Sequence, residues 1–287
     1  MRISLFGTVF LSLASLLAPC QSVLLSADSP QQTTARVLIT ITGDTPQKDQ
    51  LTAVVDGHPA QIDDLTSGKD QPLVFALLFD ISGSARDKEA FERQSSLELL
   101  RALLARGYTG YFGDFNEEIY LGHKFASEDP AQKELKSIGE FRGGSAVYDA
   151  VVAAAKLVNH TAAQTQARRA IFVLTDGRDN ASRIGFKEAV REIQQVGVPV
   201  YFVGLVADPR EQKAIREMET LSGQTGGTLI LLARPKPFIS QLLQLLENQY
   251  WMTVISPVAP DHKLHSLSVE TPQKKIQLSI PAQIVAR

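Results

Sequence analysis

Oxygen-bearing side chains gather in three short segments of the sequence. Residues 79–84 read Phe-Asp-Ile-Ser-Gly-Ser, residues 143–149 read Gly-Gly-Ser-Ala-Val-Tyr-Asp, and residues 174–177 read Leu-Thr-Asp-Gly. A hard divalent cation such as Mg²⁺ prefers six oxygen ligands in near-octahedral geometry and retains several waters. The segments therefore offer candidate ligands of Mg²⁺, with Mn²⁺ or Ca²⁺ as alternatives. These ligands are the carboxylates and hydroxyls of Asp80, Ser82, Ser84, Ser145 and Asp176.

The hydrophobic pattern predicts an α/β fold that brings these segments together. Residues 73–79 (LVFALLF) form a continuous apolar run, which is typical of a strand buried on both faces. Alternating strand and helix segments predict βαβ crossovers and a mainly parallel sheet with helices on both faces. Because ligands bind at the carboxyl ends of strands in such sheets, the candidate ligands are expected to meet at one edge. The later expected strands are 111–115, 119–123, 170–174, 200–205 and 228–232, and the expected helices are 88–105, 129–138, 146–159, 185–195, 211–221 and 238–249.

The regions on either side of the α/β pattern are predicted to be β structure. On this basis the chain divides into a β segment at 23–71, an α/β domain at 72–250 and a second β segment at 251–287. We expect the two β segments to pair into one small sheet or sandwich, with Tyr250 and Trp251 as core anchors between the domains. The strand-like runs are 34–42, 51–62 (interrupted by a turn at Asp56-Gly57), 254–255, 267–269 and 276–280.

The first 22 residues have the features of a secretory signal peptide. A short basic start precedes an apolar run at 5–18 that is too short to span a bilayer comfortably. Cys20 follows a sequence similar to a bacterial lipobox, although Pro19 occupies a position where that pattern has a small residue. Lipid anchoring at Cys20 and cleavage near Ser22 both remain open. The sequence thus predicts export to the periplasm or the exterior.

Composition excludes several classes of protein. The chain is 44% hydrophobic and 21% charged, enough apolar surface for a folded core. With 29 Lys and Arg against 31 Asp and Glu, the net charge of -2 argues against a nucleic-acid binder, which needs a basic face. The Arg168-Arg169 doublet is expected to lead into a buried strand. No segment after the first 22 residues has the ~18 apolar residues that a transmembrane helix requires.

The three oxygen-rich segments resemble the von Willebrand factor A (VWA) domain and its metal-ion-dependent adhesion site. That site has an Asp-x-Ser-x-Ser motif, then a Thr, then an Asp in a Thr-Asp-Gly loop. The resemblance covers about residues 72–250 and implies a Rossmann-like VWA fold. Residues 143–150, residues 174–183 and the region around Tyr250 followed by a β tail are most similar to secreted bacterial VWFA-related, or acidobacterial-type, VWA proteins.

The resemblance also implies a role for each candidate ligand. Ser82 and Ser84 would ligate the metal directly, and Asp80 and Asp176 would act mostly through water. Ser145 stands where the family has Thr, and it lacks the methyl group that stiffens χ1.

The implied function is a non-enzymatic, exported protein-binding or adhesion module. Because few carboxylates cancel its charge, the ion can accept an Asp or Glu of a partner protein at an open position. No motif places a base or an activated nucleophile, which hydrolysis would require. Arginines in the loops at 85–87, 142–145 and 178–183 favour an acidic partner.

Two other functions remain open for these residues. One is a metal-dependent hydrolase that uses the same oxygen ligands to activate water. The other is a structural scaffold with a vestigial metal site, for which Ser145 in place of Thr is the sequence hint. Asp80 and Asp176 are also placed where acids cap the helices that follow them.

The remaining motifs give weaker signals. Gly143-Gly144 lacks the spacing and the lysine of nucleotide-binding loops, and no GxSxG motif surrounds Ser82 or Ser145. The spacing of His262 and His265 near Asp261 suggests zinc, but solvated histidines in a β-rich tail are the expected outcome. Asp149 and Asp179 have two interpretations: they orient waters near the site, or they are a helix-start acid and a surface acid.

Overall fold

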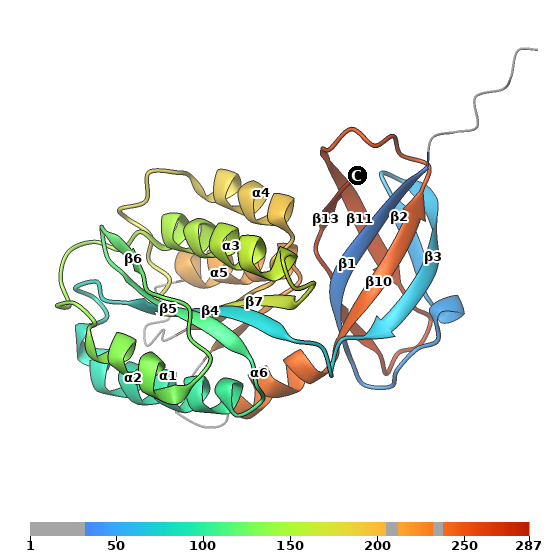
Figure 1. Ribbon diagram of the computed structural model, residues 1–287. Helices are drawn as coiled ribbons and strands as arrows, with labels where there is room; N and C mark the ends of the chain where they lie inside the picture. The colour runs from blue at the N-terminus through green and yellow to red at the C-terminus, as the bar shows by residue number, and fades with distance from the viewer. Residues whose placement is uncertain (1–31, 205–211, 232–237, 287) are drawn as a thin grey trace, which may run out of the picture.

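The computed structural model describes residues 32–204, 212–231 and 238–286, and it contains two bodies that lie side by side (Figure 1). One is an α/β domain and the other is built from β-strands. The predicted signal peptide at 1–22, including Cys20, lies outside the described residues. Among the helices within those residues, none combines the length and the apolar character needed to cross a bilayer.

The α/β domain has a six-stranded sheet in the order β6-β5-β4-β7-β8-β9. All neighbouring strands are parallel except β6, which is antiparallel to β5. Every residue of β4 is buried, as its continuous apolar run predicts. The mainly parallel sheet expected from the sequence is therefore confirmed. The strands are β4 (Leu73–Asp80), β5 (Thr109–Phe115), β6 (Ile119–Leu121), β7 (Arg168–Thr175), β8 (Val200–Gly204) and β9 (Thr228–Leu231).

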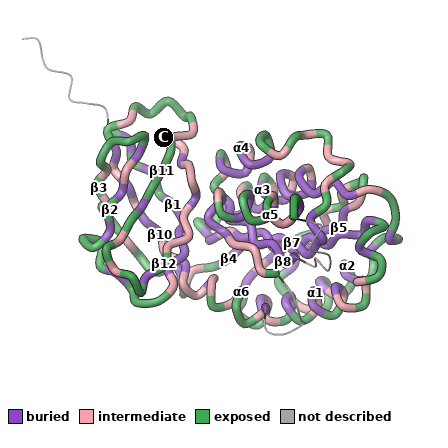
Figure 2. Tube along the Cα trace, turned by 180° about the vertical axis from the view of Figure 1, so that it is seen from behind, coloured by how far each residue is buried: buried purple, intermediate pink, exposed green. Residues whose placement is uncertain are grey.

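Helices cover both faces of this sheet, as predicted. Alternate residues of β4 face opposite sides, so Val74 packs with one set of helices and Phe75 with the other. Figure 2 shows the resulting buried layer between the helices. One face carries α3 (Val147–Ala163), α4 (Phe186–Val196) and α5 (Gln212–Gln224), and the other carries α1 (Glu89–Leu104), α2 (Glu128–Lys136) and α6 (Phe238–Glu247).

Strands from both ends of the chain form the second body, a seven-stranded sheet in the order β12-β1-β10-β3-β2-β11-β13. Strand β10 lies between β1 and β3 and is antiparallel to both. The predicted pairing of the N-terminal and C-terminal β regions is therefore confirmed. The strands are β1 (Thr33–Thr42), β2 (Thr52–Val55), β3 (His58–Ser67), β10 (Gln249–Ser256), β11 (Leu264–Glu270), β12 (Gln277–Ser279) and β13 (Gln283–Val285).

Local sequence explains most of this second sheet. Asp56 and Gly57 both have positive φ, the conformation of a tight hairpin turn between β2 and β3. Several bounds differ from the prediction by a few residues, and two differences have a clear cause. Helix α6 ends at Glu247 rather than at residue 249, because Gln249 already pairs with Thr40 in the second sheet. Strand β13 was not predicted, because its three residues are too few to show a period of two.

Arg168 joins the two bodies at the start of β7. Its side chain is fully buried, and its guanidinium donates hydrogen bonds to the carbonyl oxygens of Leu246 (2.5 Å) and Gln71 (3.1 Å). It also donates to the hydroxyl of Tyr108 (2.9 Å). Gln71 lies in the connection from β3 to β4, and Leu246 lies in the last turn of α6, just before β10. The expectation that the Arg168-Arg169 doublet leads into a buried strand is confirmed, and Arg168 fastens the junction.

Candidate functional site

Asp80 lies at the centre of the oxygen-rich edge, as the last residue of β4. Its carboxylate is fully buried and accepts hydrogen bonds from the backbone N–H of Ser82 (2.9 Å), the hydroxyl of Ser145 (3.1 Å) and the hydroxyl of Thr175 (2.6 Å). Burial raises the pKa of Asp80, and the charge of Asp176 adds to this effect, whereas the hydrogen bonds from Thr175 and Ser82 oppose it. One carboxylate therefore connects all three segments.

The three serines lie around this carboxylate at different depths. The hydroxyls of Ser82 and Ser84 are 3.2 Å apart; Ser82 is buried and Ser84 is exposed. Ser145 is buried in the segment that leads into α3. The N–H of Gly83 donates to the carbonyl of Gly143 (3.0 Å), which ties the first loop to the second. The structure thus gathers four predicted site residues, Asp80 and these three serines, and of the four only Ser84 is exposed to solvent.

Asp176, the fifth predicted residue, follows the end of β7 and is also buried. It accepts the backbone N–H of Arg178 (3.2 Å). Gly177 has a φ of +78°, and an added Cβ there would collide with Met218, so the Thr-Asp-Gly turn needs glycine at this position. Because β7 lies next to β4, Asp176 is a second buried carboxyl at the same edge, and its charge raises the pKa of Asp80 further.

Glu92 is a third buried carboxyl near this edge, and the sequence analysis missed it. It lies on α1, is fully buried, and neither of its side-chain oxygens has a hydrogen-bond partner. Burial, together with the charges of Asp80 and Asp176, raises its pKa to about 9, although Lys88 lowers it in part. The hydrophobic pattern of residues 88–105 predicts an amphipathic helix, but it does not reveal that Glu92 is buried near Asp80.

Two polar residues that the prediction did not assign also shape the site. Thr175 bridges two segments: its hydroxyl donates to Asp80 and accepts the N–H of Gly177 (2.9 Å). The side-chain oxygen of Asn180 accepts the backbone N–H of Ser145 (2.7 Å), and the backbone N–H of Asn180 donates to the carbonyl of Ser145 (3.0 Å). The Thr-Asp-Gly motif pointed to Thr175, whereas nothing in the sequence singled out Asn180 for this role.

Asp149 and Asp179 hold the loop after β7 against the start of α3. Asp149 accepts the backbone N–H groups of Arg183 (3.0 Å) and Ile184 (3.2 Å). Asp179 accepts the hydroxyl of Ser182 (2.5 Å) and the N–H of Tyr148 (3.3 Å). Both carboxylates therefore bind protein groups and support the loops.

The chemistry of the donor set fits a hard cation. Within the described ranges, no salt bridge involves Asp80, Asp176 or Glu92, so no protein cation neutralises these buried carboxyls directly. The same part of the chain contains no cluster of three or more His, Cys, Asp or Glu side chains arranged to hold a metal. A cation here would therefore depend on the hydroxyls of Ser82, Ser84 and Ser145.

The other motifs have different partners. The hydroxyl of Ser82 contacts that of Ser84, and the hydroxyl of Ser145 donates to Asp80; in the described structure neither bonds to a histidine. His265 lies in β11, away from this edge, where its ring nitrogens contact Asp56 (2.6 Å) and Asp261 (2.9 Å). This histidine is therefore part of an ion-paired group on the second sheet.

The fold and the sequence define the family. The model of the von Willebrand factor type A domain matches residues 76–233, more than half of the chain. This chain belongs to the von Willebrand factor type A domain family. Comparison with curated protein sequences returns no match.

Similar solved structures come from bacterial surface and membrane proteins. The pilus adhesin SpaC from Lactobacillus rhamnosus GG, in an open conformation, has a TM-score of 0.51 at 9% identity. The match covers 87% of this chain and 47% of SpaC, so the chain spans about half the length of that adhesin. An aerotolerance-related membrane protein from Bacteroides fragilis has a TM-score of 0.47 at 17% identity, covering 61% of this chain and 98% of its own. The PilB minor pilin from Streptococcus sanguinis has a TM-score of 0.46 at 11% identity, covering 62% of both chains.

Proposed function

We propose that this chain is an exported protein-binding module that holds Mg²⁺ at the edge defined by Asp80 and uses the ion to bind an acidic side chain of a partner protein. The observation that carries the proposal is the charge imbalance at this edge. Asp80 and Asp176 are buried and have no salt-bridge partner in the described part of the chain, and burial together with their charges raises the pKa of the nearby Glu92. Burying uncompensated charge is costly, and a bound cation would offset that cost.

The arrangement of the side chains supports a binding role. Ser82, Ser84 and Ser145 are the proposed direct ligands, and Asp80 and Asp176 are proposed to act through water. When bound, the ion supplies an open coordination position for a carboxylate. Asp80 accepts hydrogen bonds from the hydroxyls of Ser145 and Thr175, so it fixes the orientation of both hydroxyls. The similarity in fold to a pilus adhesin is consistent with adhesion outside the cell.

The surface around Ser84 favours an acidic partner. Four arginines in the surrounding loops are exposed: Arg86, Arg142, Arg178 and Arg183. Arg86 donates to the carbonyl of Phe141 (2.5 Å), which holds one of these charges near the site. Positive groups around an electrophilic ion raise the local concentration of carboxylate ligands.

Thermal unfolding of the chain with Mg²⁺, Mn²⁺ or a chelator tests metal binding. An ion that binds only the folded state should stabilise it by about 2.7 kcal/mol at one hundred times its Kd. Asp80→Ala should abolish this gain, whereas the control Asp63→Ala, an exposed acid on β3, should retain it. Metal-independent unfolding of the unmodified chain would contradict the proposal and favour a scaffold.

Peptide binding tests the acidic-partner part of the proposal. Peptides that bind in Mg²⁺ should be selected from a display library and remade with Asn and Gln in place of Asp and Glu. We expect the remade peptides to bind at least tenfold more weakly, and a chelator to release the originals. Equal binding by both sets would rule out coordination of a partner carboxylate.

A further inference from the structure

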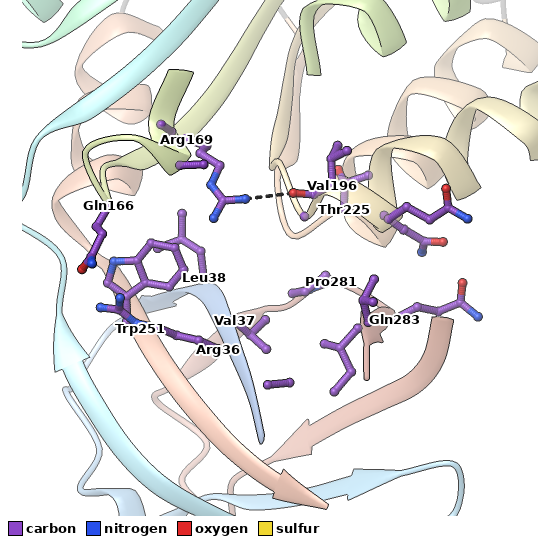
Figure 3. A pocket seen from close by; sticks show the side chains of 18 of the residues that line it. Arg36, Val37, Leu38, Gln166, Arg169, Val196, Thr225, Trp251, Pro281 and Gln283 are labelled. Carbon is purple, nitrogen blue, oxygen red and sulfur yellow. Dashed lines mark hydrogen bonds between the residues drawn. The ribbon is translucent and has the colours of Figure 1, made fainter. Parts of the chain in front are cut away.

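A cavity of about 370 Å³ lies between the two bodies, at the end of the α/β sheet opposite to Asp80 (Figure 3). The α/β domain contributes the C-terminal ends of α3 and α4 and the start of β7. The second sheet contributes β1, β13 and Trp251. Cavities of this size at domain boundaries are common ligand sites.

The lining of this cavity is positively charged. Arg36 and Arg169 belong to it together with several glutamines, and no lining residue is an Asp or Glu. The Arg36 guanidinium lies 4.4 Å from the centre of the Trp251 ring, and the Arg169 guanidinium lies 5.9 Å from it. The side chain of Arg36 is exposed, and within the described residues it takes part in no salt bridge. The cavity therefore suits an anionic ligand.

An open strand edge borders the same cavity. Strand β1 pairs with β10 from Thr33 to Thr40, but β12 pairs only with its last three residues, 40–42. The N–H of Ile41 donates to the carbonyl of Asn248, so the backbone of Ile41 faces β10. Successive residues of a strand direct their backbone groups to opposite sides. The N–H and C=O groups of Thr34, Arg36 and Leu38 therefore point away from β10. These three residues all line the cavity.

Strand β13 borders the opposite side of the cavity. The N–H of Leu267 donates to Ala282, so by the same alternation Ile284 bonds to β11 whereas Gln283 and Val285 point away from it. In the described part of the second sheet, no ladder joins β13 to β1. Unpaired strand edges bind extended chains by adding a strand.

We propose that this cavity binds a short, extended, acidic peptide segment of a partner protein. The segment pairs with the free edge of β1, and one of its carboxylates lies against Arg36. A row of outward backbone groups favours a peptide over a small anion, because a small anion would leave most of them unused. This binding is independent of the proposed metal site at the other end of the sheet.

Trp251 is the only tryptophan of the chain, so its fluorescence reports directly on the cavity. The whole chain should be titrated in chelator with an eight-residue peptide that alternates Glu and Val, with its Gln and Val counterpart, and with free glutamate. We expect a saturable change with the acidic peptide, at least tenfold weaker binding of the neutral peptide, and no change with glutamate. Equal responses to glutamate, equal binding of both peptides, or no response to any probe would each overturn the proposal.

Three variants locate the binding. Arg36→Gln removes the exposed charge, and Thr34→Pro removes an N–H that faces the cavity while leaving the bonds to β10 intact. Each should weaken the acidic peptide at least tenfold, whereas Arg191→Gln, an exposed arginine of α4 outside the lining, should not. Circular dichroism establishes that each variant is folded. Unchanged binding by folded Arg36→Gln would show that the site is wrong, and because chelator is present, this failure is distinct from failure of the metal proposal.

Discussion

The two ends of the α/β sheet bury opposite kinds of ionisable group. At the carboxyl end, Asp80, Asp176 and Glu92 are buried without a salt bridge in the described residues. At the amino end, Arg168 is fully buried and is bound by neutral acceptors, among them two backbone carbonyls and the hydroxyl of Tyr108. The acidic end thus lacks an internal counter-charge, and the basic end distributes its charge over groups of the protein.

The difference follows from what each side chain can bond to. A guanidinium has five donors, and the backbone is rich in carbonyl acceptors that can satisfy them. A carboxylate only accepts, so a buried carboxyl depends on finding donors among its neighbours. Asp80 obtains three donors, but Glu92 obtains none. The basic end can therefore serve as a structural fastening, whereas the acidic end keeps buried carboxyls that no protein cation in the described residues neutralises directly.

The largest expected effect is at the basic end. Arg168→Met should destabilise the chain by about 3 kcal/mol or more, because it leaves several buried carbonyls without donors. Chemical denaturation with a far-UV signal measures this loss. Arg191→Gln, an exposed substitution, is the control and should change stability by less than about 0.5 kcal/mol. A small effect of Arg168→Met would show that the junction does not depend on this side chain.

The next largest effect on stability is expected at the acidic end, and it depends on pH. The pKa of Glu92 is raised to about 9, so its neutral form is favoured in the folded state. Its contribution to stability is present below the ordinary glutamate pKa of about 4.3 and is lost as the pH rises toward 9. In chelator, Glu92→Gln should abolish this loss and stabilise the chain at pH 8 by about 1–3 kcal/mol.

Urea unfolding of the wild-type chain and of Glu92→Gln between pH 5 and 9 measures this difference. Glu98→Gln, an exposed change on the same helix, serves as the control. Parallel pH profiles for wild type and Glu92→Gln would mean that Glu92 carries no uncompensated charge.

A smaller effect, on the affinity for Mg²⁺, is expected from a substitution of Ser145 at the acidic end. Ser145→Thr adds the methyl group that restricts χ1, so the hydroxyl loses less freedom when it binds an ion. We expect Mg²⁺ to bind a few-fold more tightly, which corresponds to less than about 1 kcal/mol. Calorimetric titration compares the two proteins. Weaker binding by Thr would indicate that the pocket around Ser145 has no room for the methyl group.

The smallest effect on stability is expected on the second sheet, where His265 supplies a counter-charge to Asp56 and Asp261. Hydrogen bonds from His265 to Asp261 and Asp56 raise the pKa of the histidine. This contribution is present below the ordinary histidine pKa of about 6.5 and is lost as the pH rises through the raised value. Because the aspartates are partly exposed, His265→Gln should cost about 0.5 kcal/mol or less at pH 6 and nothing at pH 9. Thermal unfolding at both values tests this sign, and a larger loss at pH 9 would contradict it.

Several parts of the fold could be predicted from local sequence. The run at 73–79 identified the central strand, because only a strand covered on both faces can be apolar at every position. The segments around Asp80, Ser145 and Asp176 were expected at one edge, since parallel strands bring their carboxyl ends together. Their role as metal ligands remains a prediction. Glu92 and Asn180 could not be found in this way, because their neighbours in space come from other segments.

The sequence by itself determined most of the strands and helices, and that the strands of the central domain run mainly parallel with polar residues at their ends. Only the tertiary structure decided that α1 buries Glu92 where the charge of Asp80 acts on it, that Arg168 binds both Gln71 and the end of α6, and that β1 keeps an open edge beside Trp251. The physical reason is the distance along the sequence between the residues that interact. Periodicity and turn chemistry depend on residues a few positions apart, whereas burial, charge compensation and strand register depend on which distant segments meet.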